Sequence, residues 1–271
     1  MELGERTAVM GILNVTPDSF AEPFSKLDPD LAVEAGLRLE REGADLIDVG
    51  GESTRPGADP VSVDEELSRL MPVVTRLAER LSVPISVDTY KAEVARAAVG
   101  AGAVLVNDVS GLRNDPAMTR VVAETGAALV IMHTRGRSKT MYAEAKYRDV
   151  VGEVIAELRE GVRAAVSAGV SADRLVVDPG IGFAKQAAHS YGVLGHLPDF
   201  ARALDRPLLV GPSRKSFLRQ AVGERPAFQR DWGTAAAVTA AVLAGAHIVR
   251  VHAVEEMAQV VRVAEEMRRH A

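Results

Sequence analysis

Short apolar runs alternate along the chain with longer stretches in which apolar residues recur at helical spacing. Each run ends abruptly in a polar or glycine-rich cluster, as in 175–178, which is followed by Pro179, Gly180 and Gly182. Such a run indicates a buried parallel strand, and the spacing after it indicates an amphipathic helix. The predicted strands are 7–14, 46–50, 85–89, 104–108, 128–133, 175–178, 207–211 and 247–252.

The segments between these strands carry recognisable helix starts. Asp30 can cap a helix whose apolar positions extend to residue 44, and Ser62 with Glu65 fits a capping box for a helix to about residue 81. Pro116 stands at a favoured first helical position. The other predicted helices cover 91–100, about 147–168 and the segment after 252.

Eight strands that alternate with helices, without a break that resembles a linker, predict an α/β fold of the (β/α)8 TIM barrel type. A doubly wound open sheet is the alternative. The 271 residues suit one such barrel, so we expect a single domain over 1–271. Active sites of these barrels lie at the carboxyl ends of the strands. Those ends here carry Asn14, Glu52, Asp88, Asn107, His133, Asp178, Lys215, Arg250 and His252.

Composition narrows the class of protein further. The chain is 47% hydrophobic but only 4% aromatic, which fits an aliphatic core of parallel strands covered by helices. A net charge of −5 argues against a nucleic-acid binder. The absence of cysteine excludes disulfides and thiolate metal sites. The sequence shows neither a signal peptide nor a membrane span, so we expect a cytoplasmic protein.

Two carboxylates and an amide stand at the ends of nearby strands: Asp88, Asn107 and Asp178. In a pocket with an apolar floor, this set suits a flat, polar heterocycle that offers several N–H donors. The alternative is that these residues cap helices or bond loop backbone, as Asp and Asn often do. The glycines after Asp178 fit either a phosphate-binding loop or a turn beside a flat ligand.

Cationic side chains gather after the last two strands. Arg250 and His252 alternate on one strand, so both side chains point the same way, and Arg214 and Lys215 follow the preceding strand. The ends of strands seven and eight are a common phosphate site in this fold. The pattern favours anion binding, although a lone His252 would as readily be structural.

Three further places carry weaker signals. The Asn14 amide oxygen fits a Mg²⁺ ion that is held largely by substrate phosphates, but the residues alone do not require one. The stretch Thr54, Arg55 and Pro56 is either a lid over the barrel mouth or an ordinary loop. His133 with Arg135 and Arg137 is interpreted as a set of loop residues.

Seven motifs resemble the signatures of the dihydropteroate synthase family, in order and from the first strand to the last. They are Met10-Gly-Ile-Leu-Asn-Val-Thr-Pro-Asp-Ser-Phe20, Asp48-Val-Gly-Gly-Glu-Ser-Thr-Arg-Pro-Gly57, Ser86-Val-Asp-Thr-Tyr-Lys91, Asn107-Asp-Val-Ser-Gly111, Asp178-Pro-Gly-Ile-Gly-Phe183, Ser213-Arg-Lys-Ser216 and Arg250-Val-His252.

The resemblance implies a folate-pathway transferase, which joins 6-hydroxymethyl-7,8-dihydropterin pyrophosphate to p-aminobenzoate and releases pyrophosphate. It also implies a homodimer and a Mg²⁺ cofactor. In the family pattern, the pterin ring is bonded by Asp88, Asn107, Asp178 and Lys215 and lies against Met132 and Phe183. The pyrophosphate is held by Asn14 with Mg²⁺ and by Arg250 and His252, and the p-aminobenzoate site is framed by Thr54, Arg55, Pro56 and Ser216.

The chain departs from the family pattern in three places. Residues 21–26 differ from the expected continuation after Phe20, and Ala253 stands where an aspartate is common. Ala184 replaces a usual glycine, a small change if its φ is negative. Two rival functions remain, a pterin-binding methyltransferase domain and a non-catalytic pterin-binding paralogue. The loop at 53–56 and the motif at 213–215 favour the synthase over the methyltransferase.

Overall fold

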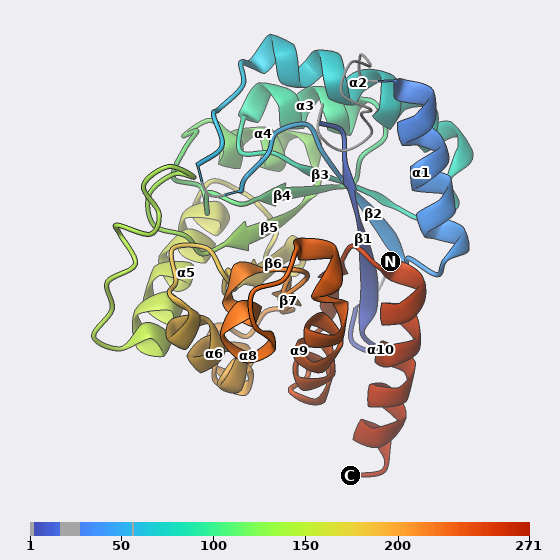
Figure 1. Cartoon of the computed structure of the whole chain (residues 1–271). Coiled ribbons are helices and arrows are strands. Elements are labelled where there is room, and N and C mark those ends of the chain that lie inside the picture. Colours follow the sequence, from blue (N-terminus) through green and yellow to red (C-terminus); the bar gives the residue numbers. More distant parts are fainter. Residues whose placement is uncertain (1–2, 17–27, 56) are drawn as a thin grey trace.

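A computed structural model of the chain describes residues 3–16, 28–55 and 57–271. Eight parallel strands form one sheet in the order β6-β5-β4-β3-β2-β1-β8-β7 (Figure 1). The strands are β1 (Ala8–Asn14), β2 (Leu46–Gly50), β3 (Ile85–Asp88), β4 (Leu105–Asp108), β5 (Ala128–Met132), β6 (Leu175–Asp178), β7 (Leu209–Val210) and β8 (Ile248–Val251).

The sheet closes into a barrel. Strand β1 pairs with both β2 and β8, and a single parallel bridge joins Val177 of β6 to Leu208, directly before β7. The N–H of Val177 also donates to the carbonyl of Pro207 at 2.9 Å. The predicted (β/α)8 barrel is thereby confirmed, and the open doubly wound sheet is excluded.

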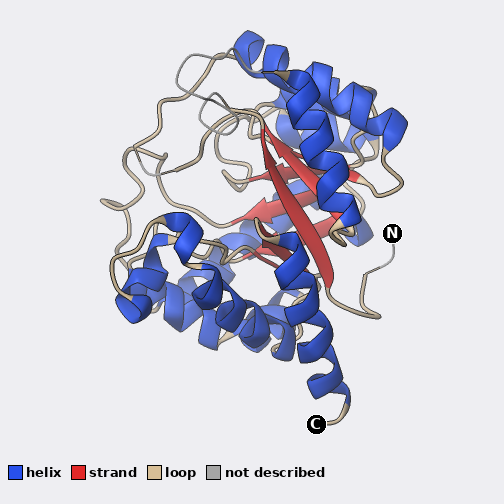
Figure 2. Cartoon of the chain, turned by 45° about the vertical axis from the view of Figure 1, so that its right-hand side comes forward, coloured by secondary structure: helices blue, strands red, loops and turns tan. Residues whose placement is uncertain are grey.

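Helices surround the strands on the outside (Figure 2). None of the helices in the described ranges combines the length and apolarity needed to cross a bilayer. The α-helices are α1 (Pro29–Arg41), α2 (Val63–Arg80), α3 (Ala92–Gly100), α4 (Met118–Thr125), α5 (Val150–Ser167), α6 (Ala187–Gly195), α7 (Leu197–Leu204), α8 (Arg219–Val222), α9 (Asp231–Leu243) and α10 (Val254–Arg269).

Some helix starts differ from those predicted. Asp28, rather than Asp30, caps α1, because its carboxylate accepts the N–H of Asp30 at 2.8 Å. Helix α4 begins after Pro116, since Asp115 closes a turn by accepting the N–H of Ala117 at 2.9 Å. The prediction for Ser62 is confirmed: its hydroxyl accepts the N–H three residues further along at 3.2 Å.

Helix α5 also begins later than predicted. Its N-cap is Asp149, whose carboxylate accepts the N–H of Gly152 at 3.1 Å. Tyr147 therefore belongs to the loop before the helix rather than to its first turn. This placement leaves the Tyr147 side chain available to the loop that follows β6.

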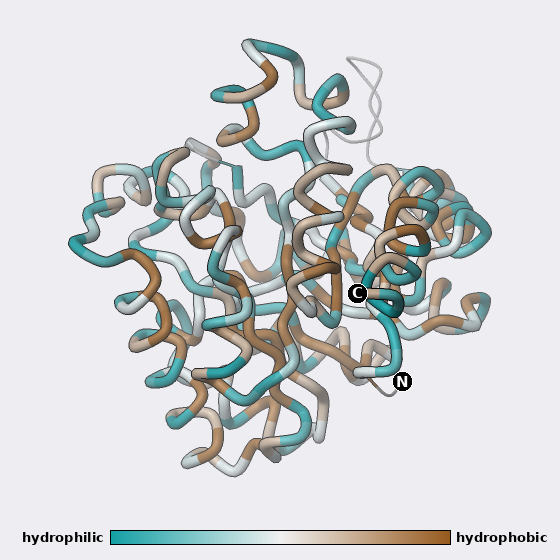
Figure 3. The backbone as a smooth tube through the Cα atoms, turned by 90° about the horizontal axis from the view of Figure 1, so that it is seen from below, coloured by the Kyte–Doolittle hydropathy of each residue, from teal (hydrophilic) through white to brown (hydrophobic). Residues whose placement is uncertain are grey.

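Successive side chains of each strand point alternately out of and into the barrel. The outward-facing side chains pack against the helices, and the inward-facing side chains fill the barrel interior. Outward-facing residues such as Val49, Val87 and Val106 are fully buried against the helices. Inward-facing residues in the lower part of the barrel are apolar. Along the backbone, hydrophobic segments lie mostly inside the molecule and hydrophilic segments mostly at its periphery (Figure 3). This lower layer consists of Ala8, Met10, Leu46, Leu105, Val130, Val176, Leu209 and Ile248.

An apolar hollow of about 740 Å³ lies at the amino ends of the strands. Residues of the lower layer, among them Leu46, Leu105 and Val176, line its floor. The polar inward-facing residues lie at the opposite end, which is where active sites of this fold are found.

Candidate active site

Strand ends bring most of the candidate residues together at one mouth. A cavity of about 40 Å³ lies among them, and Val109, Ile181 and Gly211 complete its walls. This volume is well below the roughly 300–1,000 Å³ of typical ligand pockets, so the side chains around the cavity are closely packed. The predicted residues that line it are Thr54, Asp88, Asn107, Met132, Asp178, Phe183, Lys215 and Arg250.

Arg250 joins the carboxylates of two neighbouring strands. Its Nε donates to Asp48 Oδ2 at 2.6 Å, and its Nη2 donates to Asp88 Oδ2 at 2.8 Å. Asn107 Nδ2 donates to the same Asp48 oxygen at 3.0 Å. The guanidinium thus compensates two buried negative charges, which would otherwise be unstable in the barrel.

Asp48 was not among the residues singled out from the sequence. It is fully buried in the middle of β2 and faces inward beside Asn107 and Arg250. The available signal was that Asp48 is a carboxylate inside an otherwise apolar strand. It lies two residues before Gly50, which pairs with Asp88, so Asp48 and Gly50 face the same side of the sheet. The prediction considered only strand ends and therefore missed it.

Burial moves the pKa values of three ionisable groups in the site toward 7. It raises the pKa of Asp88 to about 7, although Arg250 opposes the shift. It raises the pKa of Asp178 to about 6, against the N–H of Gly180 and the charge of Lys215. The pKa of Lys215 is lowered to about 7 by burial and by Arg250. Several perturbed groups in one cleft are typical of a functional site.

The glycines of the β6–α6 loop provide space for a turn. Asp178 Oδ1 accepts the N–H of Gly180 at 2.7 Å, and Gly180 has a φ of +70°. A Cβ at Gly180 would lie 1.9 Å from the carbonyl oxygen of His133, so no other residue fits. The turn brings Phe183 back to the mouth, where Lys215 Nζ lies 3.7 Å from its ring centroid. This geometry favours a flat ligand over a phosphate loop.

Ala184 adopts a φ of +48°. The replacement of the usual glycine was expected to be a small change only if this φ were negative, so the expectation does not apply. The left-handed conformation costs an L-residue roughly 1–2 kcal/mol. Ala184 is nonetheless fully buried and held in this conformation. The loop after Asp178 therefore contains local strain beside the site.

The predicted cation group is arranged differently from expectation. His252 Nδ1 lies 2.9 Å from Ser213 Oγ, and burial with nearby cations lowers the pKa of His252 to about 3. The ring is therefore neutral near pH 7 before any anion binds. Arg214 forms a two-bond pair with Asp231 at 2.8 Å, whereas Lys215 lines the cavity.

The remaining candidates surround the mouth. Asn14 ends β1 half-buried, and Arg55 is exposed on the loop that carries Thr54. Ser216 begins a short 3₁₀ helix, and its hydroxyl lies 3.2 Å from the Tyr142 hydroxyl. Pro56 and the segment from Phe20 to residue 26 lie outside the described residues.

The base of the 54–55 loop is fixed by buried charges. Lys91 donates to Glu52 Oε2 at 2.5 Å and is also paired with Glu66 on α2. Glu52 accepts a second hydrogen bond from the Tyr90 hydroxyl. The loop after β2 is therefore tied to the loop after β3.

Comparison with known proteins agrees with this geometry. Residues 10–252 match the model of a family described as pterin binding enzyme. The dihydropteroate synthase of Mycobacterium leprae is 48% identical over 94% of this chain and 91% of its own length. A solved structure of the Xanthomonas albilineans dihydropteroate synthase with 4-aminobenzoic acid has a TM-score of 0.91 at 44% identity, covering 97% of this chain and 93% of that one.

A second structure of that enzyme, in complex with 7,8-dihydropteroate, has a TM-score of 0.88 at 41% identity and covers 97% of this chain and 94% of the other. The chain belongs to the pterin-binding enzymes, and within that family to the dihydropteroate synthases, which are transferases.

Proposed function

We propose that the chain condenses 6-hydroxymethyl-7,8-dihydropterin pyrophosphate with p-aminobenzoate to give 7,8-dihydropteroate and pyrophosphate in folate biosynthesis. The observation that carries the proposal is the convergence of Asp88, Asn107 and Asp178 with Lys215 and Arg250 around one cavity in the barrel mouth. The similar enzyme of X. albilineans is known in complex with 7,8-dihydropteroate and with 4-aminobenzoic acid.

Buried acceptors explain how the pterin is recognised. Within the described residues, Asn107 Oδ1 and Asp48 Oδ1 are buried and have no hydrogen-bond partner. Such acceptors are unfavourable unless a donor reaches them, and a pterin carries several N–H donors along one edge. Asp178 and Lys215 bond the ring as well, and Met132 and Phe183 contact its faces.

The reaction is a displacement at the pterin methylene that needs no enzyme nucleophile. As the C–O bond to pyrophosphate breaks, positive charge spreads from the methylene into the electron-rich ring, and the Asp178 carboxylate stabilises it. Arg250, Lys215 and His252 stabilise the leaving pyrophosphate. The amine of p-aminobenzoate then forms the C–N bond and loses its proton, while Thr54, Arg55, Pro56 and Ser216 frame its site.

The donor set at the mouth also fits Mg²⁺. Asn14 offers an amide oxygen, and Mg²⁺ commonly takes one or two protein oxygens together with substrate phosphates and water. In the described ranges, no group of three or more His, Asp or Glu residues is placed to hold a metal ion. Bound there, the ion neutralises charge on the leaving pyrophosphate.

We also propose that the chain acts as a homodimer in the cytoplasm. The exposed apolar residues Leu243, Val263 and Met267 lie on the adjacent helices α9 and α10, where self-association would remove apolar surface from water. A pyrophosphate ester does not cross a bilayer unaided, so the reaction is expected where the substrate is made. Ultracentrifugation and cell fractionation test these two points.

Pyrophosphate release, measured with and without p-aminobenzoate, tests the function. Release that depends on the arylamine supports the synthase. Pterin binding without any release would support a non-catalytic paralogue. Methyl transfer to a corrinoid, without release, would support the methyltransferase.

A further inference from the structure

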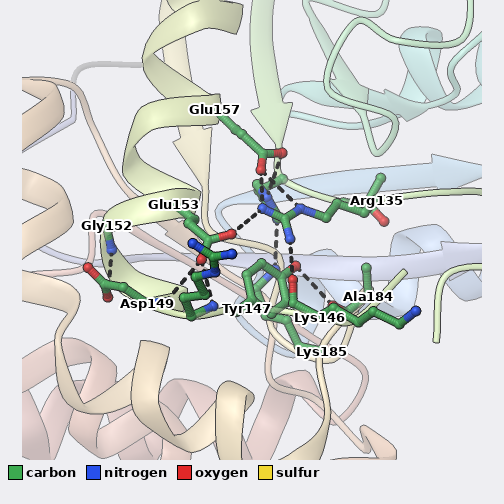
Figure 4. A network of polar contacts seen from close by, with 12 residues as sticks. Arg135, Lys146, Tyr147, Asp149, Gly152, Glu153, Glu157, Ala184 and Lys185 are labelled. Carbon is green, nitrogen blue, oxygen red and sulfur yellow. Dashed lines mark hydrogen bonds and ion pairs between the residues drawn. The ribbon is translucent and has the colours of Figure 1, made fainter. Parts of the chain in front are cut away.

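Beside the mouth lies a group of five side chains, which we call the Lys185 cluster. It connects the loop after β6 to the end of β5, to the loop that follows β5 and to α5 (Figure 4). The proposed reaction assigns none of them a role. The cluster consists of His133, Arg135, Tyr147, Glu157 and Lys185.

The cluster is built around a lysine that is only 1% exposed. Lys185 Nζ lies 2.9 Å from His133 Nδ1, and His133 Nε2 lies 3.2 Å from Glu157 Oε2. Burial, followed by the charge of Lys185, lowers the pKa of His133 to about 4, so the ring is neutral. It accepts from Lys185 at Nδ1 and donates to Glu157 at Nε2. Arg135 Nε, in turn, donates to Glu157 Oε1 at 2.9 Å.

Two members of the cluster hold the carbonyls on either side of Ala184. Lys185 Nζ donates to the carbonyl of Phe183 at 3.2 Å, and the Tyr147 hydroxyl donates to the carbonyl of Ala184 at 2.9 Å. Ala184 is the residue with a φ of +48°, a conformation unfavourable for L-alanine. The two peptide groups that define this conformation are thus held by side-chain contacts, one from Lys185 within the loop and one from Tyr147 outside it.

The conformation of Ala184 determines where Phe183 lies. The Phe183 ring lines the cavity with Asp178, and Lys215 Nζ lies over it. If the carbonyls were released, Ala184 would relax toward negative φ and turn the preceding peptide. Phe183 would then leave its position in the cavity wall.

We propose that Lys185 is a positioning residue for the pterin substrate: together with Tyr147 it holds Ala184 in the left-handed conformation and so keeps Phe183 as the platform for the ring. This inference rests on the proposed function, because the platform is defined by the pterin. The Lys185 side chain is buried and is not among the residues that line the cavity, so it is placed to act through Ala184 and Phe183 rather than on a reacting atom.

The first test replaces Lys185 with Met, which keeps the length of the side chain and removes its donors. We expect K185M to raise KM for the dihydropterin pyrophosphate by about tenfold. KM for p-aminobenzoate should stay within about twofold of wild type, since Thr54, Arg55 and Ser216 lie on other loops. Thermal unfolding monitors the fold, and calorimetry with 6-hydroxymethylpterin measures binding without turnover.

A matched pair of tyrosine variants isolates the second carbonyl contact. Y147F removes the hydroxyl that bonds Ala184 but keeps the ring beneath Arg135, whose guanidinium lies 4.1 Å from the ring centroid. Y191F removes a buried hydroxyl that has no partner among the described residues. Y147F is expected to raise KM for the pterin substrate about threefold, and Y191F to leave it unchanged.

A rescue variant distinguishes positioning from a general loss of structure. Glycine adopts positive φ freely, so A184G no longer needs the two carbonyl contacts to keep its conformation. We expect K185M/A184G to recover at least half of the loss in pterin affinity of K185M. Equal losses for both substrates, no loss in K185M, or no recovery in the double variant would each overturn the inference.

The outcome is separable from that of the proposed function. If wild-type protein binds 6-hydroxymethylpterin but releases no pyrophosphate, the synthase assignment fails, and the calorimetric comparison of K185M with K185M/A184G still decides the role of Lys185. If wild type is active and K185M binds the pterin normally, only the positioning role is overturned.

Discussion

The two ends of the barrel interior are built from inward-facing residues of the same strands, yet one end is apolar and the other is charged. In the lower part, Met10 is fully buried among aliphatic neighbours. In the upper part, Asp48 is equally buried but lies against Arg250 and Asn107. Both of these side chains are shielded from water. The difference is that the lower layer gains stability from burial, whereas the upper layer retains charges that burial disfavours.

This contrast indicates how the barrel separates folding from function. Apolar filling stabilises closure without specifying a ligand. The upper layer gives up part of that stabilisation to keep Asp88 and Asp178 buried beside Lys215, and the pKa values of all three are shifted. Substitutions in the two layers should therefore affect different observables.

The largest expected effect belongs to Asp178→Asn. Removing the carboxylate that stabilises the cationic intermediate should lower kcat by about 10²–10³-fold. Thermal stability should be kept or raised, because a buried charge is removed. Steady-state kinetics with thermal unfolding measure both, and near wild-type turnover would remove the proposed role of Asp178.

Met10→Ala should show the opposite pattern. Truncation of a fully buried side chain in the lower layer leaves a cavity and costs roughly 2–5 kcal/mol of unfolding free energy. KM for both substrates should stay near wild type at temperatures where the variant is folded. A selective rise in KM for the pterin substrate would show that the two layers are coupled.

The smallest expected effect is a pH dependence of stability that arises in the upper layer. The folded pKa of Asp178 is about 6, above the ordinary value of 3.8, so the folded state retains a proton that the unfolded chain releases. Its contribution is present below pH 3.8 and is lost as pH rises through about 6. The loss amounts to about 1–3 kcal/mol, and denaturant titrations of wild type between pH 4 and 8 measure it.

Asp178→Asn should remove the share of this pH dependence that Asp178 contributes and leave the share of Asp88, whose pKa is raised to about 7, whereas Met10→Ala should leave both unchanged. Activity has the opposite sign, since the ionised carboxylate is the working form: turnover of the wild type should rise as pH increases through about 6. A stability profile that is the same in wild type and Asp178→Asn would contradict the raised pKa.

The sequence predicted the barrel because each strand ends sharply at a turn and each helix has its own periodicity. It also predicted which residues gather at the mouth, since parallel strands deliver their ends to one edge. Helix starts were less secure. Asp28 and Asp30 are both acceptable caps, and only the path of the chain decides between them.

Contacts made across the fold were not predictable from local patterns. His133 was interpreted as a loop residue and Lys185 was not singled out, yet each is 1% exposed, and Lys185 Nζ lies 2.9 Å from His133 Nδ1. The pairing of Arg250 with Asp48 joins strands that are far apart in the sequence. The positive φ of Ala184 was not predictable from the residue type, because alanine normally adopts negative φ.

The closure of the barrel has a consequence for plasticity. Strand β7 spans only Leu209–Val210, and its seam with β6 rests on one isolated bridge at Val177. Asp178 is the next residue of β6, and Lys215 follows β7, so the two groups stand on opposite sides of that seam. The sparsest main-chain joint among the described strands therefore adjoins two of the side chains that line the cavity, and a shift at this joint would alter the mouth without unpairing the longer strands.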